Sequence, residues 1–332
     1  MLLRLLKYNT TAGYLLIPLL AVLAWWPSFI SGSYQQMAFD FFPMPLYELI
    51  SDRIPHHSLV SKIIALILLL FTGFYLIRLN NKYLFLPDRT LLPAFLFVLI
   101  ASSISPLQRL HPALVAMLFL LPAIDRLLAS YKNERLSYSF FEASFLIGTG
   151  SLVYFNLIYF AVIVWVALLI LRPVIWREWV FSILGAVIPW IFFFAALYAT
   201  HDSFLPGFEL LGTQFTAGNV FNFMHLPEYI FFGYLFFLIL IASSNVSRSM
   251  YTMKVLSRKI FMLFFWVYVT GVVIYFIVET AGIEMVVPST VPVVFLLTHF
   301  ILSRKRGFCN NGILWSIITG ALILSWLPFI IS

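Results

Sequence analysis

The chain has 332 residues, of which 62% are hydrophobic and only 10% are charged, and its mean hydropathy is +1.01. Soluble domains carry about 25% charged residues, so the composition excludes an ordinary soluble enzyme and predicts an all-α, polytopic membrane protein. The net charge of +7 is spread over short loops, whereas a nucleic-acid-binding protein shows one basic patch or stripe. No nucleic-acid partner is therefore expected. The single cysteine, Cys309, excludes a disulfide framework and a thiol metal site.

The apolar runs predict about eleven transmembrane helices in a single transmembrane domain, residues 1–332. The first run follows a short basic start, and no small-residue cleavage site comes after Trp25–Trp26–Pro27. It is therefore predicted to remain as an uncleaved span. The predicted spans are residues 13–30, 59–79, 91–104, 111–128, 140–153, 157–171, 179–199, 228–243, 260–279, 286–302 and 312–331.

Basic residues are distributed unequally between the connecting segments. Of the 20 Lys and Arg residues, 17 fall in alternate segments, and the remaining three are Arg53, Lys62 and Arg109. By the positive-inside rule the basic segments are cytoplasmic, which places the N-terminus inside and the C-terminus outside. Most acids and all but one of the histidines then fall on the outer side: Asp40, Glu48, Asp52, Asp202, Glu209, Glu228, Glu279, Glu284, His56, His57, His111, His201 and His225.

The apolar stretch 137–171 does not fit a single membrane-spanning helix. As one helix it would be about 50 Å long at 1.5 Å per residue, which is too long for the bilayer. If this stretch crossed the membrane only once, every later loop would lie on the opposite side, and the later basic loops would be outside the cell. The sequence therefore predicts two short helices broken near Tyr154–Phe155–Asn156, or a re-entrant pair. Non-helical backbone at that depth must be shielded by protein or line a cavity.

The first outer loop, residues 31–58, is too long to be a simple connector. Its segment 45–54 carries Glu48 and Asp52 four residues apart, so they share one face of a predicted helix. The opposite face is apolar: Leu46, Leu49, Ile50 and Ile54. This pattern predicts an amphipathic helix that lies in the membrane interface without crossing it.

Asp40 and a few basic residues are the candidates for chemistry on the outer side. Asp40 lies among three Phe residues, where partial desolvation would make its carboxylate a better base. Alternatively it is a solvated loop residue or a helix cap. Arg53, Arg109 and His111 are suited to a phosphate. Alternatively an outer arginine contacts lipid head groups or pairs with a loop acid.

The second long outer loop, residues 200–227, contains His201, Asp202 and His225 among Phe and amide residues, with no Lys or Arg. Such a loop suits sugar hydroxyls and ring faces, and it equally suits a segment folded onto the bilayer surface. His56, His57, His201, Asp202 and His225 could meet in space, so a divalent metal site is an alternative. No His-x-x-x-His or His-Glu-x-x-His spacing exists, and structural or interfacial His is the favoured interpretation. No metal or other cofactor is predicted.

The chain resembles a bacterial family of uncharacterised multi-spanning inner-membrane proteins. Residues 10–200 also resemble the GT-C class of glycosyltransferases that use lipid-linked sugars, and residues 201–332 would then be additional helices. The similar features are the first span, the long outer loop with Asp40 and its helix, and the short turn between the third and fourth spans. Similar too is the run Gly148–Arg172, followed by Trp176–Arg177–Glu178–Trp179 and a span that ends near Pro189–Trp190. The class often carries two neighbouring acids in that loop, and here Phe41 follows Asp40.

This resemblance implies a transferase in the bacterial inner membrane that uses a polyprenyl-phosphate sugar on the extracytoplasmic side. Asp40 would be the catalytic base, facing Arg53, Arg109 or His111 across a cavity about one sugar ring wide. Substrate-binding candidates are Arg53, Arg109, His111, Glu48, Asp52, His201, Asp202 and His225. The alternative hypothesis is non-enzymatic: a transporter, a lipid flippase or a subunit of a cell-envelope assembly, with membrane lipids and other membrane proteins as partners. A transporter should have broken helices and polar residues near mid-membrane, whereas a transferase should have a cavity at the outer interface.

Overall fold

The computed structural model describes the chain except residues 1, 8–9, 31–36, 38–39, 41–42, 56–57, 132–137, 174, 202, 217–225, 304–306 and 332. It is all-helical, with 85% helix and no strand in the part of the chain that it describes. The α-helices are α1 (Leu2–Lys7), α2 (Thr11–Ile30), α4 (Pro45–Ser51), α5 (Leu59–Tyr83), α6 (Leu92–Ala101), α7 (Pro112–Ala129), α8 (Ser139–Ser151), α9 (Ala161–Leu171), α10 (Trp176–His201), α11 (Leu205–Thr216), α12 (Leu226–Ser249), α13 (Val255–Ile277), α14 (Val286–Ser303) and α15 (Gly307–Ile331). Four short 3₁₀ helices complete the list: η1 (Ser105–Leu107), η2 (Phe155–Phe160), η3 (Met250–Thr252) and η4 (Ile283–Met285).

Among the residues that the structure describes, eight helices are long and apolar enough to cross a membrane. They are α2, α5, α7, α10, α12, α13, α14 together with η4, and α15, and each coincides with a predicted span. The other three predicted spans correspond to shorter helices. Residues 91–104 contain α6, which has 10 residues, and residues 137–171 contain α8 and η2–α9. The all-α fold and the apolar character of a polytopic membrane protein are thus confirmed, and the number of eleven spans and their orientation stay predictions.

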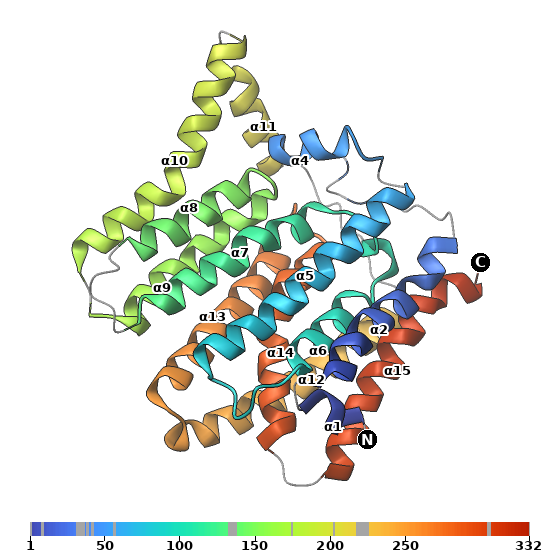
Figure 1. Cartoon of the computed structure of the whole chain (residues 1–332). Coiled ribbons are helices and arrows are strands. Elements are labelled where there is room, and N and C mark those ends of the chain that lie inside the picture. Colours follow the sequence, from blue (N-terminus) through green and yellow to red (C-terminus); the bar gives the residue numbers. More distant parts are fainter. Residues whose placement is uncertain are drawn as a thin grey trace.

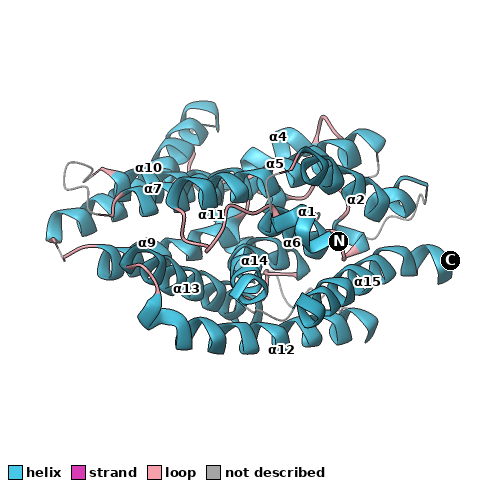
Figure 2. Ribbon diagram, turned by 60° about the horizontal axis from the view of Figure 1, so that its bottom comes forward, coloured by secondary structure: helices cyan, strands magenta, loops and turns pink. Residues whose placement is uncertain are grey.

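The centre of the bundle is formed by α6 and α14. All ten residues of α6 are buried, and 83% of the most apolar window of η4–α14 is buried. Figure 2 shows these two helices between a row containing α10, α7 and α5 and a row containing α13, α12 and α15. The helix α6 packs against α2, α5, α14 and α15, while α14 packs against α6, α12 and α13. A helix that is apolar all round is expected at such a position, because no side of it meets water.

The stretch 137–171 does fold as two short helices. The chain leaves α8 at Ser151, passes through a turn and η2, and returns as α9, so the interruption lies where it was predicted. The hairpin packs on α10, and small residues permit the close crossing. A Cβ on Gly148 would lie 2.5 Å from the Ala186 carbonyl oxygen, and one on Gly185 would lie 2.4 Å from that of Phe141. Trp190 Nε1 also donates to Ser151 Oγ at 2.9 Å.

Polar contacts fall into two groups at opposite ends of the helices. One end holds the ion pairs Lys7–Asp88, Lys82–Asp125, Arg126–Glu142 and Arg172–Glu178. The other holds the contacts Trp25–Ser102, Asp40–Arg109 and Asn156–Thr280. In Figure 1 the connections α5–α6 and α12–α13, the end of α14 and the start of α15 lie at the lower end, and α4 and α11 lie at the upper end. This grouping agrees with the predicted alternation of loops. We call the upper end of Figure 1 the outer end, and that it faces outside stays a prediction.

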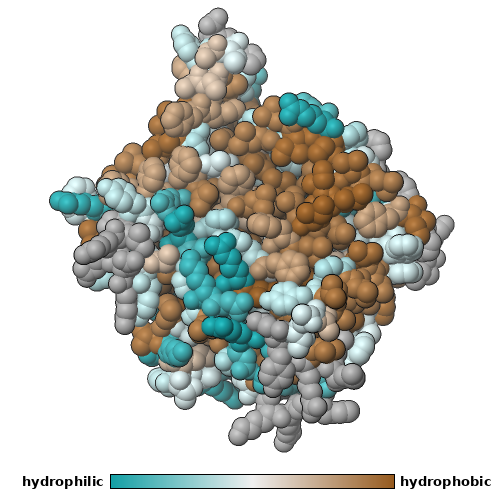
Figure 3. All heavy atoms as spheres, viewed as in Figure 1, coloured by the Kyte–Doolittle hydropathy of each residue, from teal (hydrophilic) through white to brown (hydrophobic). Residues whose placement is uncertain are grey.

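The surface is mainly apolar. Figure 3 shows a broad hydrophobic area, interrupted by a hydrophilic patch where α5 and α7 end. That patch coincides with a small polar pocket of about 280 Å³, lined by Tyr75, Arg78, Lys82, Pro122, Asp125, Arg126 and Ala129. An apolar exterior with the charges gathered toward its two ends is typical of a protein surrounded by lipid.

The two long outer loops both contain helices. Most of the predicted helix 45–54 is α4, with Leu46, Ile50 and Ile54 packed against the core, whereas Leu49 is exposed. The residue that anchors α4 was not predicted: Tyr47 is fully buried, and its hydroxyl donates to the Leu110 carbonyl at 3.0 Å. That α4 lies parallel to the membrane stays a prediction.

The second outer loop contains α11, which was not predicted. In Figure 1 the end of α10 projects from the bundle and α11 returns beside it. With 26 residues, α10 is about 39 Å long, which exceeds the ~30 Å hydrocarbon core. Phe208 packs on Phe194, and Phe215 packs edge-on against Phe155, with ring centroids 5.2 and 5.3 Å apart. These aromatic side chains of the loop thus pack against the protein.

Candidate functional site

Asp40 and Arg109 form a direct ion pair at the outer end. Arg109 Nη2 lies 2.6 Å from Asp40 Oδ2, and Nη1 lies 3.3 Å from Oδ1, so the guanidinium binds both carboxylate oxygens. The Met37 N–H also donates to Oδ2 at 2.9 Å. The two side chains are only 7% and 6% exposed. Arg109 is therefore not separated from Asp40 by the width of a sugar ring, because a buried base and a buried cation in reach of each other pair directly.

The turn that carries Arg109 is fixed by its own hydrogen bonds. Gln108 donates to the carbonyls of Ala24 and Ser102, at 3.3 and 2.7 Å, and Arg109 Nε donates to the Pro106 carbonyl at 3.3 Å. The geometry bears out the alternative in which an outer arginine pairs with a loop acid.

His111 has a structural role in this geometry. It is 1% exposed, and its Nδ1 accepts from the Leu114 N–H at the start of α7. Burial and, to a lesser extent, the neighbouring Arg109 charge lower the pKa of His111 to about 3. The imidazole is therefore neutral near pH 7 and does not supply a positive charge for a phosphate.

The remaining predicted residues lie elsewhere or outside the described part of the chain. Glu48, Asp52 and Arg53 are exposed on and just after α4. Asp202 and His225 lie outside the described residues, as does the side chain of His201. Within the residues that are described, no group of three His, Cys, Asp or Glu side chains could hold a metal ion.

A second polar cluster, which we call the Glu284 cluster, was not predicted. It consists of Tyr154, Asn156, Thr280 and Glu284. Tyr154 Oη and the Gly282 N–H both donate to Glu284 Oε1, each at 3.0 Å. Asn156 Nδ2 donates to Tyr154 Oη at 3.2 Å and to the Thr280 carbonyl at 3.3 Å, and Thr280 Oγ1 donates to Asn156 Oδ1.

Glu284 differs from Asp40 in having an oxygen without a partner. The residue is 1% exposed, and its Oε2 has no hydrogen-bond partner among the described residues. A Cβ at Gly282 would lie 2.5 Å from that oxygen, so the carboxyl group fits only because residue 282 has no side chain. Asp40 is close enough to interact electrostatically with Glu284. Ionisable groups buried in a membrane protein are candidates for function.

The helix break creates the partners of Glu284. Tyr154 and Asn156 lie between α8 and α9, where the backbone is no longer α-helical. Leu152, in the same turn, accepts a backbone hydrogen bond from Leu46 N at 3.1 Å. The interruption is therefore shielded by α4 and by the turn between α13 and α14, as non-helical backbone inside a membrane requires.

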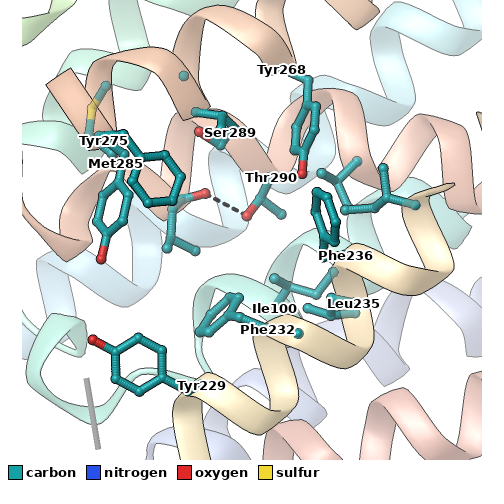
Figure 4. A pocket seen from close by; sticks show the side chains of 17 residues that line it. Ile100, Tyr229, Phe232, Leu235, Phe236, Tyr268, Tyr275, Met285, Ser289 and Thr290 are labelled. Atoms are coloured by element: carbon teal, nitrogen blue, oxygen red, sulfur yellow. Dashed lines mark hydrogen bonds between the residues drawn. The ribbon is translucent and has the colours of Figure 1, made fainter. Parts of the chain in front are cut away.

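A large apolar groove runs beside this cluster, which we call the α12–α13 groove. Its volume is about 980 Å³, and α12, α13, α14 and α6 contribute its lining. Figure 4 shows aromatic side chains of α12, among them Tyr229 and Phe232, facing Tyr268 and Tyr275 of α13. The rim is exposed, with Phe276 at 74% and Tyr229 at 49%, whereas Met285 on the floor is buried. The groove therefore opens on the surface between two helices that both pack on α14.

The groove and the Glu284 cluster adjoin. Met285 lines the groove and follows Glu284 in the chain. Tyr275, also in the lining, is close enough to interact electrostatically with both Tyr229 and Glu284. The largely apolar lining of the groove thus includes the phenol groups of Tyr229, Tyr268 and Tyr275 and the hydroxyl groups of Ser289 and Thr290. Glu284 is not part of the lining, but it directly precedes the lining residue Met285 in the chain.

The chain matches no protein-family model, no curated protein and no solved structure. The functional hypothesis therefore rests on these residues and their geometry.

Proposed function

We propose that the protein binds a membrane lipid, with its hydrocarbon chain in the α12–α13 groove and its head group at the outer polar residues. The observation that carries this proposal is the continuity between a long apolar groove and the Glu284 cluster. The volume of the groove, about 980 Å³, lies at the top of the ~300–1,000 Å³ range of small-molecule sites.

The dimensions of the groove fit one leaflet. Its lining on α12 runs from Tyr229 to Ile239, which is about 15 Å at 1.5 Å per residue. This is half of the ~30 Å hydrocarbon core. Under the predicted orientation, Tyr229 and Phe276 lie at the outer end, so the groove would accept a chain from the outer leaflet.

The specific reaction we propose is sugar transfer from a polyprenyl phosphate on the extracytoplasmic side of a bacterial inner membrane. In this hypothesis, the ion pair of Asp40 with Arg109 determines how the donor phosphate could bind. Both oxygens of Asp40 are engaged by Arg109, so a donor phosphate would have to compete with Asp40 for the guanidinium. Arg is suited to that exchange, because its planar fork binds carboxylate and phosphate in the same bidentate way.

Lipid transport is the second candidate, and the interruption between α8 and α9 favours it. Transporters often place polar side chains at such broken helices, and Tyr154 and Asn156 lie at this one. Reconstituted vesicles distinguish the two functions. A transferase converts a lipid-linked sugar without moving it across the bilayer, whereas a transporter moves a fluorescent lipid without changing it chemically.

Filling the groove tests the proposal. Gly233 lines the groove, and a Cβ on it would meet no atom within 4 Å, so Gly233→Phe adds a ring to the lining from a position with free space. The matched control is Gly312→Phe on α15, where a Cβ also meets nothing. The probe is a polyprenol that carries a photoreactive diazirine, added to the full-length protein in nanodiscs.

We expect crosslinks to peptides of α12, α13 and α14, reduced at least fivefold by Gly233→Phe and unchanged by Gly312→Phe. Crosslinks distributed over the whole apolar surface, or equal in the two variants, would exclude the groove as a lipid site.

A further inference from the structure

We propose that Glu284 is the acid–base residue of the protein, and that it exchanges a proton with a hydroxyl-bearing head group held at the outer end of the α12–α13 groove. This inference rests on the proposed function, because it assigns the chemistry of the same lipid site. It replaces Asp40 as the candidate base and names a hydroxyl group as the feature that the site recognises.

Asp40 and Glu284 differ in the hydrogen bonds that their carboxylate oxygens accept. Asp40 receives two contacts from Arg109 and one from the Met37 N–H, so its lone pairs are directed at protein donors. Glu284 has both of its hydrogen bonds on Oε1, and Oε2 has none in the part of the chain that the structure describes. An unpaired buried oxygen costs about 1–3 kcal/mol, and a ligand donor would remove that cost.

The charges around Glu284 select the kind of head group. Tyr154 from the α8–α9 turn donates a hydrogen bond to Glu284. Tyr275 in the groove and Asp40 are both close enough to interact electrostatically with Glu284. Tyr229 in turn is close enough to interact with Tyr275. The cation near Asp40 is already bound to that acid. A bare phosphate beside Glu284 and Asp40 would meet two acids, whereas a hydroxyl group can donate to Oε2. The site therefore suits the hydroxyl of a lipid alcohol or of a lipid-linked sugar.

Burial would make Glu284 an effective base when it is ionised, since water does not stabilise its charge there. In the transfer step the hydroxyl O–H bond breaks, and its proton goes to Glu284 Oε2. The hydroxyl oxygen forms a bond to the anomeric carbon of the donor sugar. The bond from that carbon to the donor phosphate breaks, and the phosphate leaves with the electron pair.

Dicyclohexylcarbodiimide is a direct probe, because this apolar reagent modifies protonated carboxyl groups in apolar sites. The full-length protein in nanodiscs would be treated with it, and the modified residue identified by mass spectrometry. We expect modification of Glu284 and not of Asp40. We expect at least fivefold protection of Glu284 by a polyprenol, and less than twofold protection by a polyisoprene hydrocarbon of equal length without the hydroxyl group.

Two variants extend the test. Glu284→Gln keeps the shape and the acceptor for Tyr154, and it should lower any glycosyl transfer by about 10²–10⁴-fold while polyprenol crosslinking persists. Gly282→Ala should displace the carboxyl group, because the new Cβ would lie 2.5 Å from Oε2, and should reduce its modification.

An unmodified Glu284, or equal protection by alcohol and hydrocarbon, would overturn the proposal. Full activity of Glu284→Gln would do the same. Each of these outcomes can occur while polyprenol crosslinking in the groove is intact, so the failure of this inference is distinguishable from the failure of the proposed lipid site.

Discussion

Changing Asp40 to an uncharged residue tests whether the role of this carboxylate is structural or catalytic. A base that faces a cavity can be changed to Asn with little effect on stability. In this structure, however, Asp40→Asn leaves the guanidinium of Arg109 buried without its counter-charge, and the two side chains are only 7% and 6% exposed. Removing one partner of a buried pair typically costs about 3–5 kcal/mol. Asp40→Asn and Arg109→Gln should therefore each destabilise the protein by about that amount.

The double variant tests whether this cost belongs to the pair. Two amides leave no unpaired charge, so Asp40→Asn with Arg109→Gln should cost less than the sum of the single changes, by up to about 3 kcal/mol. Thermal unfolding of the full-length protein in nanodiscs, followed by Trp fluorescence, would measure both effects. If Asp40→Asn melts like the wild type and abolishes a transfer activity, the ion pair is not structural and Asp40 is the base after all.

Three further predictions concern packing, orientation and pH. Gly148→Ala should destabilise the protein by about 1–3 kcal/mol through the α8–α10 contact, whereas Gly312→Ala should not, and thermal unfolding checks both. A cysteine at the exposed Glu209 should react with an impermeant maleimide added to intact cells while Cys309 does not, and the reverse pattern would invert the orientation. Because burial lowers the pKa of His111 from 6.5 to about 3, its stabilising contribution is complete above pH 6.5 and is lost as the pH falls toward 3. His111→Asn, which can still cap α7, should flatten the pH dependence of the unfolding temperature in that window.

Features that depend on local pattern were predictable from the sequence. The break between α8 and α9 followed from the length of an apolar stretch and from the positive charge of the loops after it, which fixes the number of crossings. The apolar face of α4 followed from the spacing of Leu46, Ile50 and Ile54. These arguments use helix geometry and the distribution of basic residues along the chain, and no distant partner is needed.

Features that depend on distant partners were not predictable. Asp40 and Arg109 were both singled out, yet their pairing joins residues 69 positions apart, and no local rule gives that distance. Glu284 was noted only as an outer acid, and its hydrogen bond to Tyr154 spans 130 positions. A carboxyl group directly before an apolar run and two residues after a glycine was the available signal. The groove was missed because it depends on α14 holding α12 and α13 apart.

The contact between the first and last long helices has a consequence for how the protein is made. Trp326 on α15 donates to the Leu23 carbonyl on α2, 303 positions away, and α15 also packs on α6 and α1. During synthesis α2 and α6 enter the membrane long before α15 exists, so the surfaces that α15 later covers must meet lipid or an assembly factor in the meantime. Insertion of α15 is then the event that closes this side of the bundle. A ribosome stalled before Gly307 should accordingly leave α2 open to crosslinking by membrane chaperones, and its release should end that contact.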